Sequence, residues 1–362
     1  MISKNFFESL EAIAAERGLK IEDVLSKVEM AMTVACRDTD YKGDIKMDID
    51  PEKKKIRFFD FRYVVEEYTE GGKGEILVED AKILKPKAKI KPGMEIKTEV
   101  DFTAFGRKSV SKFKNTLLNE LKNLEREEAF NFYQDKVGEI ITCKVVDINE
   151  KFVTLSAVRN TNLTLPMTEA IPGEQFVEGQ SVKVYVMKVE KTTKGPKISI
   201  TRINKEIVRR LFEITVPEIA DGSVEIMGIS REPGSRTKIG VVGTKHGVDP
   251  KGACVGQGGL RIKSINEALN NEKIDIFTWK QNPIDLIAEA LLPARSLSVV
   301  IESEKEKKAW VIVKDDQYSL AIGRGGQNVR LAAYSIDWRI DIKRFSEALK
   351  EGIPFTFNVI QK

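Results

Sequence analysis

The residues whose types and spacing could hold a phosphate group gather in two glycine-rich segments. The first reads CVGQGGLRIKSI at residues 254–265, and the second reads AIGRGGQNVRLA at residues 321–332. Glycines at both corners of a Gly-x-x-Gly loop permit backbone dihedral angles and a close approach of a partner that a side chain would block. A helix that begins directly after such a loop presents free N–H groups and the positive end of its dipole. Each segment therefore predicts a phosphate-binding cradle.

The two segments belong to a unit that occurs twice in the chain. An offset of 67 residues (323 minus 256) places the glycines of one segment on those of the other. Downstream, KIDIFTW at 273–279 resembles RIDIKRF at 339–345, and two strand-like runs precede each loop. The order strand, strand, helix, loop, helix, strand is thus repeated. Two adjacent cradles, each beside an apolar groove, fit single-stranded RNA, whose backbone the loop clamps while the groove reads about four bases.

We assign RNA binding to the residues of the two loops and to the basic or polar residues beside them. In the first unit these are Lys251, Gly256, Gln257, Gly258, Gly259, Arg261 and Lys263, and in the second unit Gly323, Arg324, Gly325, Gly326, Asn328 and Arg330. The first loop carries no basic residue between its corner glycines, so its attraction for phosphate must come from backbone N–H groups and from the cations outside the loop. The sequence leaves open whether it grips RNA as strongly as the second loop.

The glycine spacing argues against a nucleotide-binding enzyme. The sixth position of the Gly-x-Gly-x-x-Gly frame is Arg261 or Asn328, and neither loop is followed by the Gly-Lys-Ser/Thr that phosphate-binding NTPases need. Asp275 and Asp341 alternate with apolar residues as in half-exposed strands, and His246 is an isolated imidazole. We therefore expect a non-enzymatic protein that uses no cofactor.

The composition indicates several domains and a reducing compartment. The 362 residues suffice for roughly two to four domains. The 59 basic residues nearly balance the 55 acidic ones, so only local clusters can select a polyanionic partner. Cys36, Cys143 and Cys254 form no CxxC pair, which predicts three reduced thiols and no metal site. Charged residues interrupt the apolar pattern of the N-terminus and no later run could span a bilayer, so we expect a cytoplasmic protein that does not bind membranes.

The first part of the chain predicts a mixed domain of helices and strands. Apolar residues at three- and four-residue steps predict two helices over residues 3–37, broken at Gly18. Alternating apolar residues, the turn DPEKKK and the returning run IRFFDF predict a hairpin. A long helix follows, with an apolar stripe and lysines mostly off that stripe. The stripe consists of Val110, Phe113, Leu117, Leu121 and Leu124.

A second, smaller region predicts a β-barrel. Between Lys136 and Arg202, five short strand-like runs alternate with turns. This pattern is typical of the OB type, whose outer face and loops commonly hold oligonucleotides. Phe152 and Tyr185 lie in these runs and are candidates for stacking on bases, although an aromatic residue in a barrel strand can equally belong to the core.

Four motifs in order resemble signatures of the NusA family of bacterial transcription elongation, termination and antitermination factors. They are REPGSRTKIGV, VDPKGACVG, KIDIFTWKQNP and AIGRGGQNVRLA, and an FGR motif at residues 105–107 precedes them. The resemblance covers nearly the whole chain and implies an α+β multidomain fold. Its parts are a mixed α/β N-terminal domain at 1–132, a five-stranded OB-type β-barrel of the S-one type at 133–202, two tandem type II KH domains at 203–281 and 282–348, and a short C-terminal tail at 349–362.

The same resemblance implies partners. The N-terminal domain would dock on the RNA polymerase core near the RNA exit channel, with Arg107 of the FGR motif and Lys114 facing polymerase or the exiting RNA hairpin. The barrel and the KH domains would hold nascent single-stranded RNA, other antitermination factors are further partners, and we expect a monomer. Two features depart from the family pattern. The helix after FGR is not rich in alanine and glutamine, and the tail EGIPFTFNVIQK has no acidic repeats, so we expect no C-terminal autoinhibitory module.

A competing hypothesis is an RNA-binding accessory protein of RNA decay or translation that is not attached to polymerase. Barrels and KH domains also occur in exonucleases and ribosomal proteins. An exonuclease, however, would place a large phosphorolytic core first and its KH domain before the barrel, and the order predicted for this chain is different.

Overall fold

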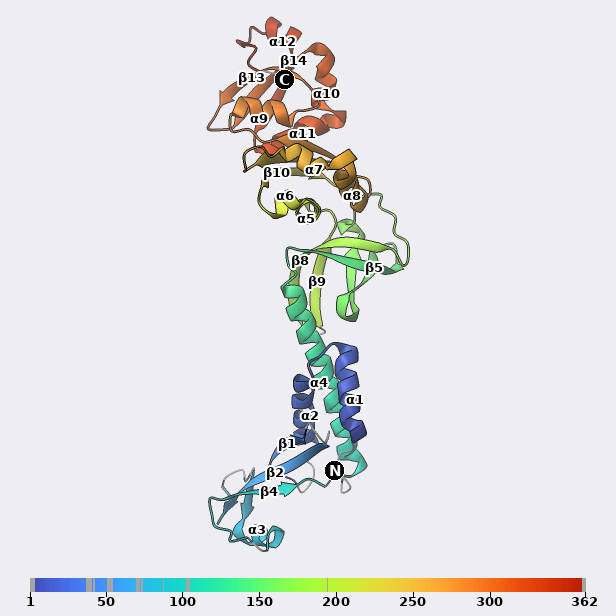
Figure 1. Cartoon of the computed structure of the whole chain (residues 1–362), viewed down its shortest axis with the longest axis vertical. Coiled ribbons are helices and arrows are strands. Elements are labelled where there is room, and N and C mark those ends of the chain that lie inside the picture. The colour runs from blue at the N-terminus through green and yellow to red at the C-terminus, as the bar shows by residue number, and fades with distance from the viewer. Residues whose placement is uncertain are drawn as a thin grey trace. The chain divides into compact units, whose positions relative to one another are not determined.

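The computed structural model describes residues 4–36, 41, 43–50, 55–69, 72, 74–86, 88–101, 105–193 and 195–359. The chain divides into two compact units, Met1–Asp135 with Glu190–Lys197 and Lys136–Val189 with Ile198–Lys362. Figure 1 shows the elements in chain order, from blue to red. Within the described ranges, no helix combines the length and the apolar character needed to cross a bilayer.

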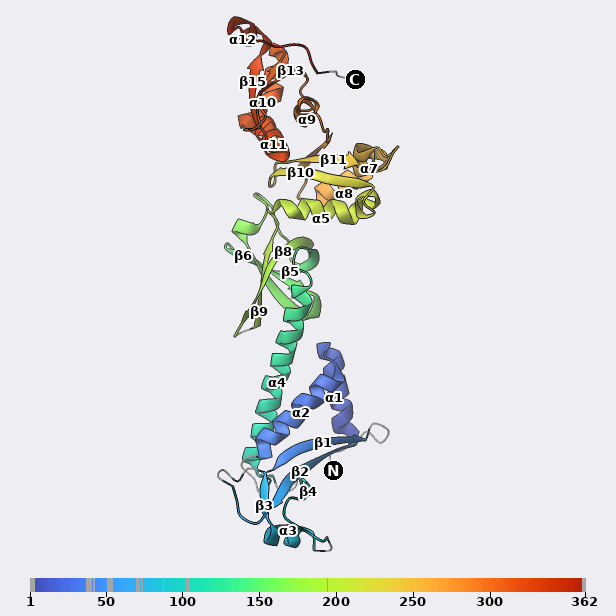
Figure 2. The ribbon, with the colours of Figure 1, turned by 90° about the vertical axis from the view of Figure 1, so that its left-hand side faces the viewer.

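Three helices of the first unit pack around one apolar core (Figure 2). They are α1 (Lys4–Arg17), α2 (Ile21–Cys36) and α4 (Arg107–Gln134). Gly18 has a φ of 65° and separates α1 from α2, which confirms the predicted break. Arg17 of α1 pairs with Glu125 of α4 at 2.7 Å.

The apolar stripe of α4 is confirmed for most of its length and is wrong at its first residue. Leu121 and Leu124 are buried in the core, and the preceding stripe residues pack partly against it. Val110 is 54% exposed. It lies in the first turn of the helix, on the same face as Arg107 and Lys114, which are both exposed. The core does not extend along this face to the beginning of α4.

A four-stranded sheet completes the N-terminal domain. Its strands are β1 (Asp44–Asp50), β2 (Lys55–Val65), β3 (Glu75–Leu77) and β4 (Glu95–Glu99), and α3 (Val78–Leu84) follows β3. β2 pairs with the three others, antiparallel with β1 and β4 and parallel with β3. The predicted hairpin is therefore confirmed, and residues 51–54 of its predicted turn lie outside the described residues.

The next five strands form a nearly closed antiparallel barrel, as predicted. They are β5 (Ile140–Ile148), β6 (Phe152–Ala157), β7 (Thr161–Pro166), β8 (Ser181–Thr192) and β9 (Gly195–Thr201). Their order across the sheet is β7-β6-β5-β8-β9. Val182, Val184 and Val186 alternate along β8 and are buried, because successive residues of a strand point to opposite faces.

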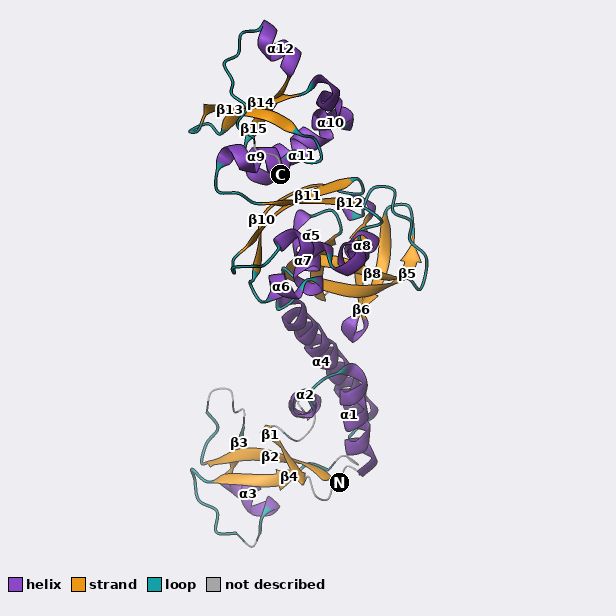
Figure 3. Cartoon of the chain, turned by 45° about the horizontal axis from the view of Figure 1, so that its top comes forward, coloured by secondary structure: helices purple, strands orange, loops and turns teal. Residues whose placement is uncertain are grey.

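Two three-stranded sheets with their helices follow, and Figure 3 distinguishes these helices from the strands. The first contains α5 (Lys205–Thr215), α6 (Pro217–Ala220), β10 (Val224–Glu232), β11 (Arg236–Gly243), α7 (Pro250–Val255), α8 (Leu260–Ala268) and β12 (Lys273–Thr278). The second contains α9 (Pro283–Ala290), β13 (Ser296–Ser303), β14 (Lys308–Val313), α10 (Tyr318–Ile322), α11 (Gln327–Ile336), β15 (Arg339–Arg344) and α12 (Phe345–Lys350).

Both sheets have the same connectivity. In each, the first two strands are antiparallel, and the second strand is parallel to the third: β11 to β12, and β14 to β15. The helix pair that holds the glycine loop connects the two parallel strands. This is the arrangement of a type II KH domain, and it confirms the repeated unit predicted from the sequence.

Candidate nucleic-acid interface

The two glycine loops have nearly identical backbone conformations. The paired φ values are 74° and 74° at Gly256 and Gly323, 59° and 58° at Gly258 and Gly325, and 75° and 76° at Gly259 and Gly326. All six angles lie in the region that residues with a side chain rarely adopt. The repetition predicted from the spacing of the glycines is therefore a repetition of backbone geometry as well.

The first corner glycine of each loop also provides space. A Cβ atom added at Gly323 would lie 2.7 Å from the backbone nitrogen of Asn328, and one added at Gly256 would lie 2.7 Å from Cγ of Arg261. The helix after each loop therefore folds back close to the loop that precedes it. The middle positions differ, because among the described residues no atom lies within 4 Å of a Cβ added at Gly258 or Gly325.

The helix after each loop begins without a capping side chain. α8 follows Gly259 and α11 follows Gly326, and a glycine has no side chain that could accept a hydrogen bond from the first turn. The N–H group of the first residue of each helix, Leu260 or Gln327, donates back to the carbonyl oxygen of Gln257 or Arg324 in the loop, so an anion would meet the later N–H groups of the turn. Such a helix terminus attracts an anion through its N–H groups and its dipole.

Several predicted RNA-binding residues lie where a ligand could reach them. Gln257 and Arg324, at the equivalent variable positions of the two loops, are both exposed. Lys263 on α8 has a side chain that is 74% exposed, and Lys251 on α7 is half-buried. The second loop therefore presents a guanidinium at its tip, whereas the predicted cations of the first unit lie on the flanking helices.

Two other predicted residues mainly support the loops. Asn328 is buried, and its Nδ2 atom donates to the carbonyl oxygens of Leu291 and Ala321, both at 3.0 Å. Arg261 occupies the equivalent position in the first unit; it donates to the carbonyl oxygen of Ala253 at 2.6 Å and pairs with a carboxylate, Glu218, at 2.8 Å. These contacts explain why both positions are polar, since each side chain ties the loop to its own domain.

The aromatic candidates of the barrel differ in their surroundings. Phe152 begins β6 and is 37% exposed. Tyr185 is half-buried and packs against the apolar core of the first KH domain. Phe152 is therefore the better placed of the two to stack on a base, and the position of Tyr185 favours a packing role.

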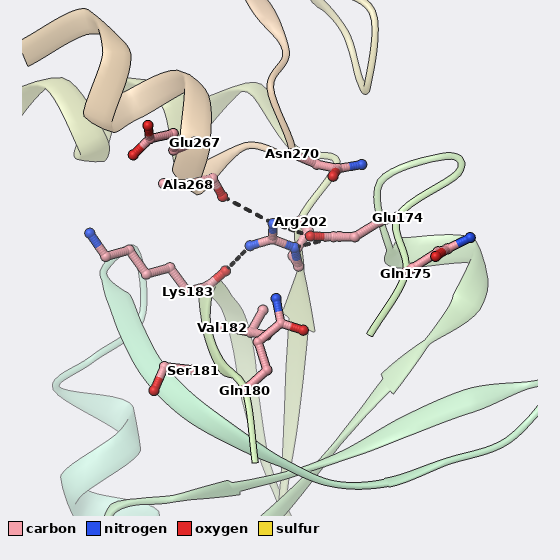
Figure 4. A pocket seen from close by; sticks show the side chains of 10 residues that line it. All are labelled: Glu174, Gln175, Gln180, Ser181, Val182, Lys183, Arg202, Glu267, Ala268 and Asn270. Atoms are coloured by element: carbon pink, nitrogen blue, oxygen red, sulfur yellow. Dashed lines mark hydrogen bonds and ion pairs between the residues drawn. The ribbon is translucent and has the colours of Figure 1, made fainter. Parts of the chain in front are cut away.

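A buried ion pair lies where the barrel meets the first KH domain (Figure 4). Arg202 donates from Nε to Glu174 at 2.8 Å, and it also donates to the carbonyl oxygens of Lys183 in the barrel and Ala268 at the end of α8. A polar cavity of about 170 Å³ adjoins these side chains. Sequence reasoning missed this pair, because no local pattern distinguishes Glu174 from an exposed loop carboxylate.

Within the described parts of the chain, no group of three or more histidine, cysteine, aspartate or glutamate side chains could hold a metal ion. The three cysteines are buried as free thiols, and burial raises the pKa of each to about 12.

A five-stranded barrel followed by two type II KH domains with matching glycine loops defines a multidomain protein of the RNA-binding class. Three family models match the chain: the NusA N-terminal domain at residues 5–127, the NusA-like first KH domain at 202–279 and the NusA-like second KH domain at 283–350. The transcription termination/antitermination protein NusA of Bacillus subtilis is 37% identical over 97% of this chain and 94% of its own length. Its counterpart from Halalkalibacterium halodurans is 36% identical over 97% of this chain and 91% of its own length. The counterpart from Thermus thermophilus is 35% identical over 97% of this chain and 94% of its own length.

The chain therefore belongs to the NusA family. This membership confirms the resemblance on which the sequence interpretation rests. It also confirms the prediction of a non-enzymatic transcription factor, because NusA proteins are named for termination and antitermination of transcription.

Proposed function

We propose that this chain binds the RNA polymerase core near the RNA exit channel and holds nascent single-stranded RNA, and that it thereby modulates pausing, intrinsic termination and antitermination. It acts in the cytoplasm as a monomer, together with other antitermination factors. The N-terminal domain supplies the polymerase contact, with Arg107 and Lys114 on the exposed face of α4. The barrel and the two KH domains supply the RNA contacts.

The observation that carries this proposal is the shared geometry of the two glycine loops. Each loop has a first corner glycine that the following helix approaches closely, a middle glycine with open space around it, and a helix N-terminus without a capping side chain. A phosphate group fits this combination, because it can approach the backbone at Gly258 or Gly325 and accept hydrogen bonds from the first turn of the helix. Holding RNA in this way changes the path of the transcript without making or breaking a bond.

The hypothesis of an accessory protein of RNA decay or translation is not favoured. The match to the NusA N-terminal domain covers residues 5–127, which the hypothesis of an RNA-binding accessory protein leaves without a role. Binding to polymerase is therefore part of the proposal, and RNA binding by the glycine loops is the part that can be tested with purified protein and RNA alone.

Carboxylates placed at the tips of the loops test the proposal. In the variant Arg324→Asp/Gly325→Asp, two carboxylates replace a guanidinium where the phosphate should lie. The substitution at Gly325 has room, and aspartate tolerates a positive φ better than most residues. We expect RNA affinity to fall by roughly tenfold or more. The slope of log affinity against log salt should become shallower by roughly 0.7 for each lost phosphate contact.

A matched control separates local contact from total charge. Lys350→Asp/Gly352→Asp makes the same change in charge, and Gly352 also has a positive φ of 67° with open space at its Cβ among the described residues. This control should weaken RNA binding only slightly. The first-loop variant Gln257→Asp/Gly258→Asp removes no cation and should cost less than the second-loop variant. Undiminished RNA affinity of both folded loop variants, at two salt concentrations, would remove the glycine loops from the proposed function.

A further inference from the structure

The second glycine loop is held by a carboxylate of the first KH domain. Glu232, the last residue of β10, accepts hydrogen bonds at Oε1 from Nε and Nη2 of Arg330, at 2.8 Å and 2.6 Å. Its Oε2 atom accepts from Nε2 of Gln327 at 2.7 Å. Gln327 and Arg330 lie on the first turn of α11, directly after the loop. Both carboxylate oxygens of Glu232 are thus directed at the N-terminus of the helix that completes the second cradle.

The contact reaches the loop itself. Nη1 of Arg330 donates to the carbonyl oxygen of Gly325 at 3.1 Å, while the rest of the guanidinium binds Glu232. Gln327 also donates to Oγ of Ser235 in the turn after β10, at 2.8 Å. Arg330 therefore bridges the first KH domain and the tip of the second loop, and its planar guanidinium fixes the geometry of both ends.

The other end of α11 is fixed on the same strand. A Cβ atom added at Gly228 of β10 would lie 1.9 Å from the carbonyl oxygen of Ser335, near the end of α11. The helix backbone therefore rests directly on the strand at this point, and Glu232 holds the helix at its opposite end. α11 cannot turn or slide along β10 without losing one of these contacts.

The end of β10 that carries the Glu232 carboxylate is itself held in place. The preceding residue, Arg231, forms an ion pair with Glu272 at 2.9 Å, and both side chains are almost completely buried. Arg231 also donates to the carbonyl oxygens of Arg202 and Asn204, at 2.9 Å and 2.8 Å. Glu232 stays ionised near neutral pH, because the hydrogen bonds from Gln327 and Arg330 outweigh the effect of its burial and lower its pKa.

Among the described residues, the equivalent position of the first cradle makes no such interdomain contact. Lys263 occupies the position of Arg330 in the repeated unit, and its Nζ atom lies 4.0 Å from Glu267 of its own helix. The interdomain contact is therefore specific to the second cradle and is not a general feature of the repeated unit.

We propose that Glu232 is a positioning residue that fixes the second cradle relative to the first, so that one RNA strand engages both cradles at a set spacing. This inference rests on the proposed RNA binding and deepens it. When two sites are held at a fixed spacing, the second binding event becomes intramolecular and its effective concentration rises. A rigid arrangement also avoids the entropy that would be lost if the loop were ordered only on binding. Glu232 acts through Gln327 and Arg330 and does not itself contact RNA.

RNA length distinguishes this role from a general effect on binding. The full chain with Glu232→Ala is compared with wild type on an oligonucleotide of about five nucleotides, which suits one KH groove, and on one of about twelve, which can reach both cradles. We expect affinity for the long RNA to fall by roughly tenfold, while affinity for the short RNA stays constant or rises slightly. Loss of a negative charge by itself would strengthen binding to both.

A control on the same strand measures that electrostatic effect. Glu225 is exposed on β10, and Glu225→Ala makes the same change in charge. It leaves the contacts between Glu232 and α11 in place. The ratio of long-RNA to short-RNA affinity should stay at the wild-type value in this control. Adding Gln327→Ala to Glu232→Ala should lower the ratio only slightly further, because the second change then removes just the remaining hydrogen bond of Gln327 to Ser235. If the alanine variant does not fold, Glu232→Gln replaces it in the experiment. This variant keeps the side-chain shape, and it should lower the ratio of long-RNA to short-RNA affinity by a smaller amount.

The outcomes separate this inference from the proposed function. An unchanged ratio in folded Glu232→Ala or Glu232→Gln, with wild type still favouring the long RNA, would overturn the positioning role and leave RNA binding intact. If wild type bound neither oligonucleotide, the proposed RNA binding itself would fail. An equal decrease on both lengths would make Glu232 a stability residue of the second KH domain, which also contradicts the inference.

Discussion

Arg202 and Glu174 form an ion pair in which the two side chains are only 3% and 6% exposed. Arg202 lies at the end of the barrel, and its guanidinium also donates a hydrogen bond to the carbonyl oxygen of Ala268 in the last turn of α8. The N-terminus of the same helix forms the first phosphate cradle. A cation at the C-terminus of a helix complements its dipole. Arg202 thus holds the C-terminus of α8, the helix of the first cradle, whereas Glu232 holds the N-terminus of α11, the helix of the second cradle.

Removing one member of this pair should destabilise the protein strongly. Glu174→Ala leaves the guanidinium of Arg202 buried without its carboxylate, and such a change typically costs about 3–5 kcal/mol. Urea denaturation followed by circular dichroism measures the free energy of unfolding. Glu178→Ala, an exposed change in the same loop, should alter it by less than about 0.5 kcal/mol. If the two variants were equally stable, the ion pair would have no structural role.

The two corner glycines should differ in their tolerance of a side chain. Gly323→Ala brings a methyl group to 2.7 Å from a backbone nitrogen, whereas Gly256→Ala meets the side chain of Arg261, which can move. Both substitutions cost about 1–3 kcal/mol, because a positive φ combined with an extended ψ is a conformation that is almost exclusive to glycine. Gly323→Ala should lower the free energy of unfolding more than Gly256→Ala does, because its methyl group meets backbone. The difference should appear as a lower midpoint of thermal unfolding for Gly323→Ala. A larger loss for Gly256→Ala would contradict the close approach of α11 to its loop.

The sequence was sufficient to predict the loops and the strands, because glycine positions and apolar periodicity are local properties. The matching φ values at Gly258 and Gly325 follow from that local pattern. The partner of Arg330 could not be predicted, because Glu232 lies 98 residues earlier in the chain and is brought close only by the packing of α11 on β10. The burial of a side chain could not be predicted for the same reason, because it depends on packing between distant segments. Asn328 was predicted to bind RNA from its position beside the loop, and only the fold shows that its amide is used inside the domain.

The three cysteines should be unreactive in the folded protein. Burial raises the pKa of Cys143 to about 12, from an ordinary value of 9.0, so the reactive thiolate is scarce at pH 8. A disulfide reagent should therefore label the native chain slowly, and it should label three thiols after unfolding in urea. Rapid labelling of one thiol in the native protein would contradict its burial.

The same raised pKa predicts how stability depends on alkaline pH. Because the folded state keeps the proton of Cys143 longer than the unfolded state does, its contribution is fully present below pH 9.0 and is lost as the pH rises toward 12. The free energy of unfolding should decline over this interval, and Cys143→Ala should make the decline less steep. An identical pH dependence for wild type and variant would show that this thiol does not contribute.

The exposed face of α4 provides a test of the polymerase contact. Arg107, Val110 and Lys114 share this face, at steps of three and four residues, and all three are exposed. An exposed ion pair is worth about 0.2–1 kcal/mol, so Arg107→Ala/Lys114→Ala, which removes two cations, should bind core polymerase roughly twofold to thirtyfold more weakly. It should also shorten pauses that depend on an RNA hairpin. The buried stripe of α4 is unchanged, so the circular dichroism spectrum should not change.

The control for this face is Lys20→Ala/Lys122→Ala, which removes two exposed cations from the same domain. It should retain most of the polymerase affinity and the pause lifetime, because the lost charges lie elsewhere on the domain. RNA affinity of both double variants should equal that of wild type, since the glycine loops belong to the other unit of the chain. Pause lifetimes that are unaltered in Arg107→Ala/Lys114→Ala, at protein concentrations near the dissociation constant, would make this face an ordinary solvated surface and would place the polymerase contact on another part of the N-terminal domain.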